Sequence, residues 1–426
     1  MERRGFVKTV AAASLPWPGL SAGAHGLEEL GKDLQAVGEG ASRWRRLRRE
    51  FRLRPGLAHF NTGSCGAAPK VVTEAVARYD QELEGDPVKN TFGGLGSRME
   101  DVRRLAAGFL GADVSEIALT RNTTEGMNGV ATGIDWEPGD EVLTTNHEHG
   151  GGMVCWQHLR KHRGVAVRYL KMPTLLRHKD DFLDLVEQHL TPRTRVCSFM
   201  DVDTITGLRY PLADVARITR PRGVLLVCDG AQSPGMLDVD VKALGVDTFA
   251  SSSHKWMLAP KGSGLLYIRR EVQDRVHPVF LHSGYGGYSA SSGTRDVAGI
   301  LGHGVAMDFH NLLGRDLVEA RCRELSARLR QHLEGIPKVR ILTPAQPELS
   351  GGILTFSVDG LSASLLARRL LEEHDMAVKV PQGTYAFVPG PDVERESYNA
   401  LRVSTHIYND EAEVDRLAAA VEEMVG

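Results

Sequence analysis

The chain has 426 residues, a length that suits two or three domains at about 150 residues each. With 42% hydrophobic and 25% charged residues, it has the composition of a globular protein, which excludes a disordered chain, and no apolar run approaches a membrane span. The formal net charge of −3 gives no indication of a nucleic-acid partner.

The first 24 residues are predicted to be an export signal. Arg3-Arg4 and Lys8 precede a weakly apolar stretch, as in a twin-arginine signal, and Ala22-Gly23-Ala24 offers small residues for cleavage. The alternative is an ordinary basic N-terminus. We therefore expect a periplasmic or otherwise exported protein, with a cytoplasmic one as the alternative.

Residues 25–65 are expected to form an N-terminal segment that packs on the C-terminal domain. Within it, Trp44, Leu47 and Phe51 share one stripe of a helix whose other faces are basic. A patch for nucleic acid or an anionic membrane is the alternative, but the rest of the chain is not basic.

Residues 66–310 alternate short apolar runs with helical patterns. Continuous apolar strands in this order indicate a mostly parallel sheet covered on both faces, in a large α/β domain. The expected strands are 116–120, 141–144, 195–199, 224–228 and 264–268, and the clearest helices are 99–110, 123–132 and 182–190.

The pattern changes after residue 310. A long amphipathic helix, expected over residues 312–333 with a break allowed, leads into strands and helices that end with a helix over 414–425. Residues 311–426 are therefore predicted to form a smaller C-terminal α+β domain.

The most unusual local sequence is Ser251-Ser252-Ser253-His254-Lys255-Trp256. Lysine is almost never fully buried without a role, and a buried lysine can lose its proton and form a Schiff base with a carbonyl compound. The alternative is a surface loop in which a lysine has a histidine neighbour by chance.

Asp229 follows the predicted strand 224–228 at its carboxyl end, where open α/β sheets bind ligands. A carboxylate there can pair with a pyridinium nitrogen and keep it protonated, so that the ring accepts electrons. The alternative is that Asp229 caps the next helix.

Two further runs follow predicted strands. Thr123 and Thr124 start a helix, whose free N–H groups suit a phosphate, although many helices begin with such capping residues. In Asn146-His147-Glu148-His149 the two histidines suggest a metal pair, or an imidazole stacked on an aromatic cofactor. No further ligand cluster and no CxxC pair is present, so no metal is predicted.

In this order and spacing, these motifs resemble the class V aminotransferase superfamily, whose members are pyridoxal 5′-phosphate (PLP) enzymes of fold type I. The resemblance extends from about His59 to about Val425, and residues 59–64, 293–296 and 401–409 are most similar to its isopenicillin N epimerase-like branch. It implies an α/β fold with a seven-stranded, mostly parallel sheet flanked by helices, a smaller C-terminal domain, and a homodimer with shared active sites.

The resemblance also implies roles for the candidate residues. Lys255 is expected to form the internal aldimine and to move the α-proton, Asp229 to hold the pyridinium nitrogen, and His149 to stack on the ring. Arg402 is expected to bind the substrate α-carboxylate, which a bidentate guanidinium suits. The other expected cofactor contacts are Thr123, Thr124, Ser252 and His254 at the phosphate, Gln232 at the phenolic O3′, Asp203 in a position often held by Asn, and Thr294, which reaches the phosphate from the neighbouring subunit.

Two features depart from the family pattern. Asp203 stands where relatives often carry an Asn or a small hydroxyl residue, and Asp201 adds a second carboxylate. Together they put an inherited substrate preference in doubt. The stretch from Ala377 to Tyr398 contains no cysteine, which disfavours a desulfurase that forms a persulfide.

The expected function is that of a PLP-dependent enzyme acting on an amino acid or amino-acid-like small molecule through an α-carbanion (quinonoid). Epimerase-like chemistry is favoured over a carbon–sulfur lyase or an aminotransferase because of the branch resemblance alone. The alternatives are a non-catalytic PLP-binding relative and an unrelated phosphate-binding protein that uses Gly262-Ser263-Gly264. No nucleic-acid partner and no stable membrane insertion are expected.

Overall fold

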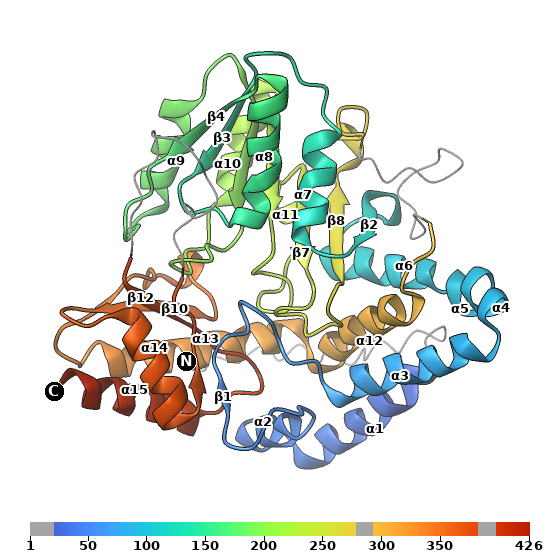
Figure 1. Ribbon diagram of the computed structural model, residues 1–426, viewed down its shortest axis with the longest axis vertical. Helices are drawn as coiled ribbons and strands as arrows, with labels where there is room; N and C mark the ends of the chain where they lie inside the picture. Colours follow the sequence, from blue (N-terminus) through green and yellow to red (C-terminus); the bar gives the residue numbers. More distant parts are fainter. Residues whose placement is uncertain (1–20, 278–292, 382–397) are drawn as a thin grey trace, which may run out of the picture.

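The computed structural model describes residues 21–277, 293–381 and 398–426. The predicted α/β architecture is confirmed: a seven-stranded sheet flanked by helices forms the main body, and the orange and red elements form a separate small sheet with its own helices (Figure 1). No helix among the described residues is long and apolar enough to cross a bilayer.

The large sheet has the strand order β2-β8-β7-β6-β5-β3-β4. Only β8 runs antiparallel to its neighbours, and the other pairs are parallel, as predicted. The strands that were not predicted are β4 and β7, and β7 ends in the serine-rich run that sequence reasoning assigned to a turn. The seven strands are β2 (Ile117–Thr120), β3 (Glu141–Thr145), β4 (Ala166–Leu170), β5 (Thr194–Met200), β6 (Leu225–Asp229), β7 (Thr248–Ser252) and β8 (Gly264–Ile268).

Both faces of this sheet are covered by helices. Successive residues of a strand point to opposite faces, and they pack here in two different hydrophobic cores. Val142 and Val227 pack in one core with α7 and α8, whereas Leu143 and Leu226 pack in the other with α3, α6 and α12. The longer helices of this body are α3 (Lys70–Gly85), α6 (Met99–Leu110), α7 (Thr123–Thr132), α8 (Gly150–Arg163), α9 (Lys179–His189), α10 (Leu212–Thr219) and α12 (Val297–Leu313), and the short ones are α4 (Pro87–Phe92), α5 (Gly94–Ser97) and α11 (Val241–Leu244).

The C-terminal part has a three-stranded antiparallel sheet in the order β12-β10-β9. The predicted break in the long helix lies at Gly314, whose φ of +89° separates α12 from α13. The elements are α13 (Arg315–Leu333), β9 (Val339–Ile341), β10 (Ile353–Val358), α14 (Ala363–His374), β11 (Met376–Ala377), β12 (Ala400–Ser404) and α15 (Glu411–Val425).

The N-terminal segment contacts both bodies. Helix α1 (Ser21–Val37) packs on α3 and α12 of the main body. Helix α2 (Ala41–Arg48) instead reaches the C-terminal part, since Arg48 forms an ion pair with Glu413. Strand β1 (Ala58–His59) then pairs with β11. The segment 25–65 therefore contacts both bodies.

Candidate functional site

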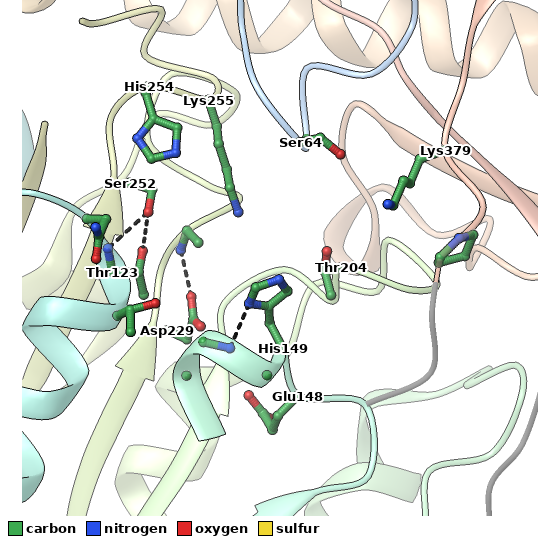
Figure 2. Close-up of a pocket in the computed structure, with 18 of the residues that line it drawn as sticks. Ser64, Thr123, Glu148, His149, Thr204, Asp229, Ser252, His254, Lys255 and Lys379 are labelled. Atoms are coloured by element: carbon green, nitrogen blue, oxygen red, sulfur yellow. Dashed lines mark hydrogen bonds between the residues drawn. The ribbon is translucent and has the colours of Figure 1, made fainter. Parts of the chain in front are cut away.

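A cavity of about 430 Å³ lies at the carboxyl ends of β6 and β7, where the main body meets the C-terminal part. Lys255, Asp229 and His149 line it from the main body, and Arg402 and Lys379 line it from the C-terminal part. Figure 2 shows Lys255, His149 and Lys379 pointing toward the same space. The two residues on which the predicted chemistry depends most, Lys255 and Asp229, are thus brought together.

Lys255 follows β7 in a turn that packs closely against the chain near residue 66. A Cβ on Gly66 would lie 2.1 Å from the Lys255 carbonyl oxygen, so only glycine fits there. The pKa of Lys255 is lowered to about 8, because burial lowers it most, the Asp229 carboxylate opposes this, and the charge of Arg402 adds to the lowering. The amine is therefore far easier to deprotonate than an ordinary lysine.

Asp229 is the last residue of β6 and is buried. Its Oδ1 accepts a hydrogen bond from the Ala231 backbone N–H at 2.9 Å. Glu148 lies nearby in the cavity wall, and burial, followed by the Asp229 charge, raises its pKa well above the usual value. The cavity thus has a second carboxyl group, that of Glu148, and its raised pKa favours the protonated, neutral form of this side chain.

His149 is the N-cap residue of α8, and its Nδ1 accepts a hydrogen bond from the Gly151 N–H at 3.1 Å. Its pKa is lowered, by burial first and then by the Lys255 charge. A neutral imidazole exposed to the cavity can stack on an aromatic ring, which agrees with its predicted place (Figure 2).

The predicted phosphate residues gather at the N-terminus of α7. The Ser252 hydroxyl oxygen accepts a hydrogen bond from the Thr123 backbone N–H at 2.9 Å and lies 2.9 Å from the Thr123 hydroxyl. Thr124 and His254 line the same wall, and the buried Nδ1 of His254 has no partner among the described residues. Hydroxyls, the positive end of the helix dipole and an unpaired imidazole nitrogen fit a phosphate.

Arg402 extends from β12 into the opposite wall and is buried. Its Nη1 donates to the carbonyl and hydroxyl oxygens of Thr204, at 2.9 and 2.7 Å, and Nη2 donates to Ser64 Oγ at 3.0 Å. These contacts hold the planar guanidinium at the edge of the cavity, the arrangement that suits a carboxylate.

Asp203 does not line the cavity. Its Oδ2 lies 2.5 Å from His147 Nδ1 and accepts from the Thr206 hydroxyl, and its Oδ1 accepts from the Ile205 N–H at 2.6 Å. Both carboxylate oxygens are therefore engaged in hydrogen bonds within the turn at residues 203–206 and with His147, and the neighbouring Thr204 lines the cavity instead. The predicted contact of Asp203 with the cofactor stays a prediction.

Gln232 and Thr294 are also not among the residues that line this cavity. The Gln232 oxygen accepts from the Trp256 indole N–H at 2.7 Å, and its amide nitrogen donates to the Gly63 carbonyl at 2.9 Å, so it supports the wall from behind. Thr294 lines a separate hollow with Arg121 and other residues. Their predicted contacts with O3′ and with the phosphate of a neighbouring subunit stay predictions.

Sequence reasoning missed several residues of the cavity, including Ser64, Glu148, Thr204 and Lys379. Glu148 could have been predicted from its place beside His149 in the sequence. The other three reach the cavity through contacts between segments that are far apart in the chain. Of the cysteine-free stretch from Ala377 to Tyr398, residues 382–397 lie outside the described residues. No cluster of three metal-ligating side chains is present in the part of the chain that the structure describes.

The cavity fits PLP on its own features. The N-terminus of α7 and the unpaired His254 nitrogen suit the phosphate, Lys255 suits the aldehyde, and Asp229 suits the ring nitrogen. The first turn of α8 packs closely on the cavity wall, since a Cβ on Gly152 would lie 2.6 Å from Asp229 Oδ2 and one on Gly151 would lie 2.5 Å from the Thr124 hydroxyl oxygen. Such a bare wall leaves room for a flat ring.

Comparisons with known proteins agree with this cavity. Residues 60–417 match the family model described as aminotransferase class-V. The chain is 33% identical to an isopenicillin N epimerase of Amycolatopsis lactamdurans, over 90% of this chain and 99% of that protein. It is 27% identical to a probable cysteine desulfurase of Methanothermobacter thermautotrophicus, over 89% of this chain and 98% of that protein. It is similar to a solved complex of the cystine C-S lyase C-DES with cysteine persulfide, with a TM-score of 0.76 and 26% identity over 87% of this chain and 99% of that one. The chain therefore belongs to the class V aminotransferase family, as predicted, and is an enzyme that depends on pyridoxal 5′-phosphate.

Proposed function

We propose that this enzyme moves the α-proton of an amino acid or an amino-acid-like compound, in the manner of an isopenicillin N epimerase. The observation that carries the proposal is one cavity that holds Lys255 and Asp229 on one side and Arg402 on the other. The similarity to isopenicillin N epimerase over 90% of the chain favours this branch.

PLP, when bound, draws electrons away from the α-carbon of the amine joined to it. Arg402 orients the substrate through its α-carboxylate, because Thr204 and Ser64 hold the guanidinium in place. With a pKa near 8, the Lys255 Nζ can take up the α-proton from one face of the substrate, and delivery of a proton to the opposite face would give the epimer. The Asp229 carboxylate stabilises a proton on the ring nitrogen, and the neutral His149 ring covers one face of the site.

The assignment of Lys255 is tested by borohydride reduction of the protein supplied with PLP. We expect a phosphopyridoxyl adduct on Lys255 and bleaching of the yellow colour. Mapping of the adduct to another lysine, or its absence, would refute the assignment.

The reaction is tested by incubating amino acids with the enzyme in deuterated water. We expect one deuterium at the α-carbon together with formation of the opposite enantiomer. The second candidate is a carbon–sulfur lyase, which the similarity to C-DES favours. Release of sulfur from cysteine or cystine, without racemised amino acid, identifies that reaction instead.

We propose that the protein is a homodimer with shared active sites. The resemblance to the family supports this, and so does the place of Thr294 in a hollow apart from the Lys255 cavity, where it is available to a neighbouring copy. Light scattering gives the mass in solution. A monomer that retains full PLP affinity would contradict the proposal.

We also propose that the chain is exported by the twin-arginine route. The support is the sequence Arg3-Arg4 with small residues at 22–24, and residues 1–20 lie outside the described residues. N-terminal sequencing of the native protein is expected to give a start near His25. An intact Met1 in a cytoplasmic fraction would exclude export.

A further inference from the structure

We propose that Lys379 binds a second anionic group, a carboxylate on the substrate side chain, so that the enzyme prefers amino acids with an acidic side chain. This inference deepens the proposed function and rests on it. It does not follow from the α-carboxylate contact, which Arg402 provides.

The first observation is that Lys379, two residues after β11, lies directly opposite Arg402 of β12 in an antiparallel bridge. The Lys379 N–H donates to the Arg402 carbonyl at 3.1 Å, and the Arg402 N–H donates to the Lys379 carbonyl at 2.7 Å. Residues that exchange both backbone hydrogen bonds in an antiparallel pair place their side chains on the same face of the sheet. Two cations therefore project side by side into one cavity.

Like charges directly opposite each other destabilise a sheet unless something compensates for them. Among the described residues, no carboxylate forms an ion pair with Lys379. The hydrogen bonds of the Arg402 guanidinium go to neutral groups, and the Asp203 carboxylate raises the pKa of Arg402 without a hydrogen bond to it. An anionic ligand between the two side chains would supply the compensation. The pair is thus arranged to bind anions.

The cofactor phosphate is not the anion that Lys379 meets. In Figure 2, Ser252 and Thr123 lie on one side of the cavity, Lys379 lies on the other, and Lys255 and His149 lie between them. A phosphate at the N-terminus of α7 is therefore on the far side of the site. The anion at Lys379 belongs to the substrate.

The charges that face the cavity support a doubly anionic substrate. Lys255, Lys379 and Arg402 supply three cationic groups, while burial and the Asp229 charge raise the pKa of the Glu148 carboxyl and favour its neutral form. Once Lys255 is joined to PLP, two cations remain on the substrate side. Arg402 takes the α-carboxylate, and Lys379 takes the second one.

The test compares L-glutamate with its neutral isostere L-glutamine in spectral titrations of the holoenzyme. We expect Lys379→Ala to weaken glutamate binding about tenfold or more, the effect of losing a hydrogen bond between charged groups, and to leave glutamine binding unchanged. Lys379→Arg, which keeps the charge, is expected to retain the preference. Lys179→Ala, which removes a lysine from α9 outside the cavity, is the control and is expected to bind both as the wild type does.

A second measurement does not depend on reaction of the amine. Calorimetry compares glutarate with its monoamide, neither of which can be joined to PLP, and we expect the Lys379→Ala variant to lose the preference for glutarate. Equal weakening of glutamate and glutamine would overturn the inference, because Lys379 would then act on the α-carboxylate. If the ratio of glutamate affinity to glutamine affinity were the same in the Lys379→Ala variant as in the wild type, the inference would be overturned as well. Borohydride mapping of Lys255 is the separate test of the proposed function, so the two failures are distinguishable.

Discussion

Gly152 lies against the carboxylate of Asp229 so closely that a Cβ at this position would be 2.6 Å from Oδ2. The first turn of α8 and the end of β6 are thereby held together at the place where the ring nitrogen of PLP is expected. The carboxylate cannot move toward this turn, which fixes its direction.

The Gly152→Ala variant tests this contact. The added methyl group would displace the Asp229 carboxylate, and an overpacked site of this kind costs about 1–3 kcal/mol. We expect the affinity for PLP to fall by roughly tenfold to a hundredfold on that basis, measured by titrating the apoprotein. Gly108→Ala is the control, since a Cβ at this helix position meets nothing within 4 Å and PLP affinity should not change.

The Lys255 amine should react in the apoprotein with a pH midpoint near 8. Amine reagents attack only the neutral form, so labelling of Lys255 should rise at a lower pH than labelling of exposed lysines. Mass spectrometry after brief labelling gives the midpoint for each lysine. A midpoint at the ordinary value of about 10.5 would mean that the amine is not desolvated.

The neighbours of Lys255 should move this midpoint in opposite directions. The Asp229 carboxylate raises the pKa of Lys255, so Asp229→Asn is expected to lower the midpoint. The Arg402 guanidinium lowers the same pKa, so Arg402→Gln is expected to raise it. Shifts of the same sign in the two variants would contradict the arrangement of charges.

Arg402→Ala should abolish recognition of the α-carboxylate while leaving PLP in place. Charge-assisted bidentate pairs are strong, and we expect amino-acid affinity to fall by about a hundredfold. Spectral titration of the holoenzyme measures it, and the absorbance before substrate is added shows that the cofactor is retained. Amino-acid affinity equal to that of the wild type would remove Arg402 from this role.

Asp203→Asn should destabilise the protein without removing a group from the cavity wall. The carboxylate accepts from the backbone of Ile205 and pairs with His147, and both Asp203 and His147 are buried. Loss of this charged partner is expected to reduce the free energy of unfolding by about 1–3 kcal/mol, measured by urea denaturation. A large loss of PLP affinity at full stability would instead return Asp203 to the cofactor.

The parallel sheet could be predicted because its buried strands are continuous apolar runs, such as residues 224–228. Strand β7 could not, since Ser251 and Ser252 at its end are polar residues that favour turns. Lys255 was found because a lysine beside a histidine in a serine-rich run is unusual, and Asp229 and His149 were found because each follows a predicted strand. Lys379 was not, because its place beside Arg402 depends on backbone pairing between two segments that the sequence does not connect.

Asp203 shows a different limit. Its position in the chain is next to the cavity, and its residue type suits a cofactor contact, yet the adjacent Thr204 is the residue that faces inward. The sequence does not reveal which of two neighbours has its side chain tied into a turn. The hydrogen bonds to Ile205 and Thr206 decide it.

Gly314 has a consequence for how this enzyme tolerates change. The residue is not part of the cavity wall, yet it joins α12 of the body that carries Lys255 to α13 of the body that carries Arg402. Its φ of +89° is readily available only to glycine. A side chain at this position would change the angle between α12 and α13. It would thereby change the distance between Lys255 and Arg402, which bind opposite ends of the substrate. We therefore expect substrate fit to respond to the backbone torsion at this position, which lies outside the cavity wall.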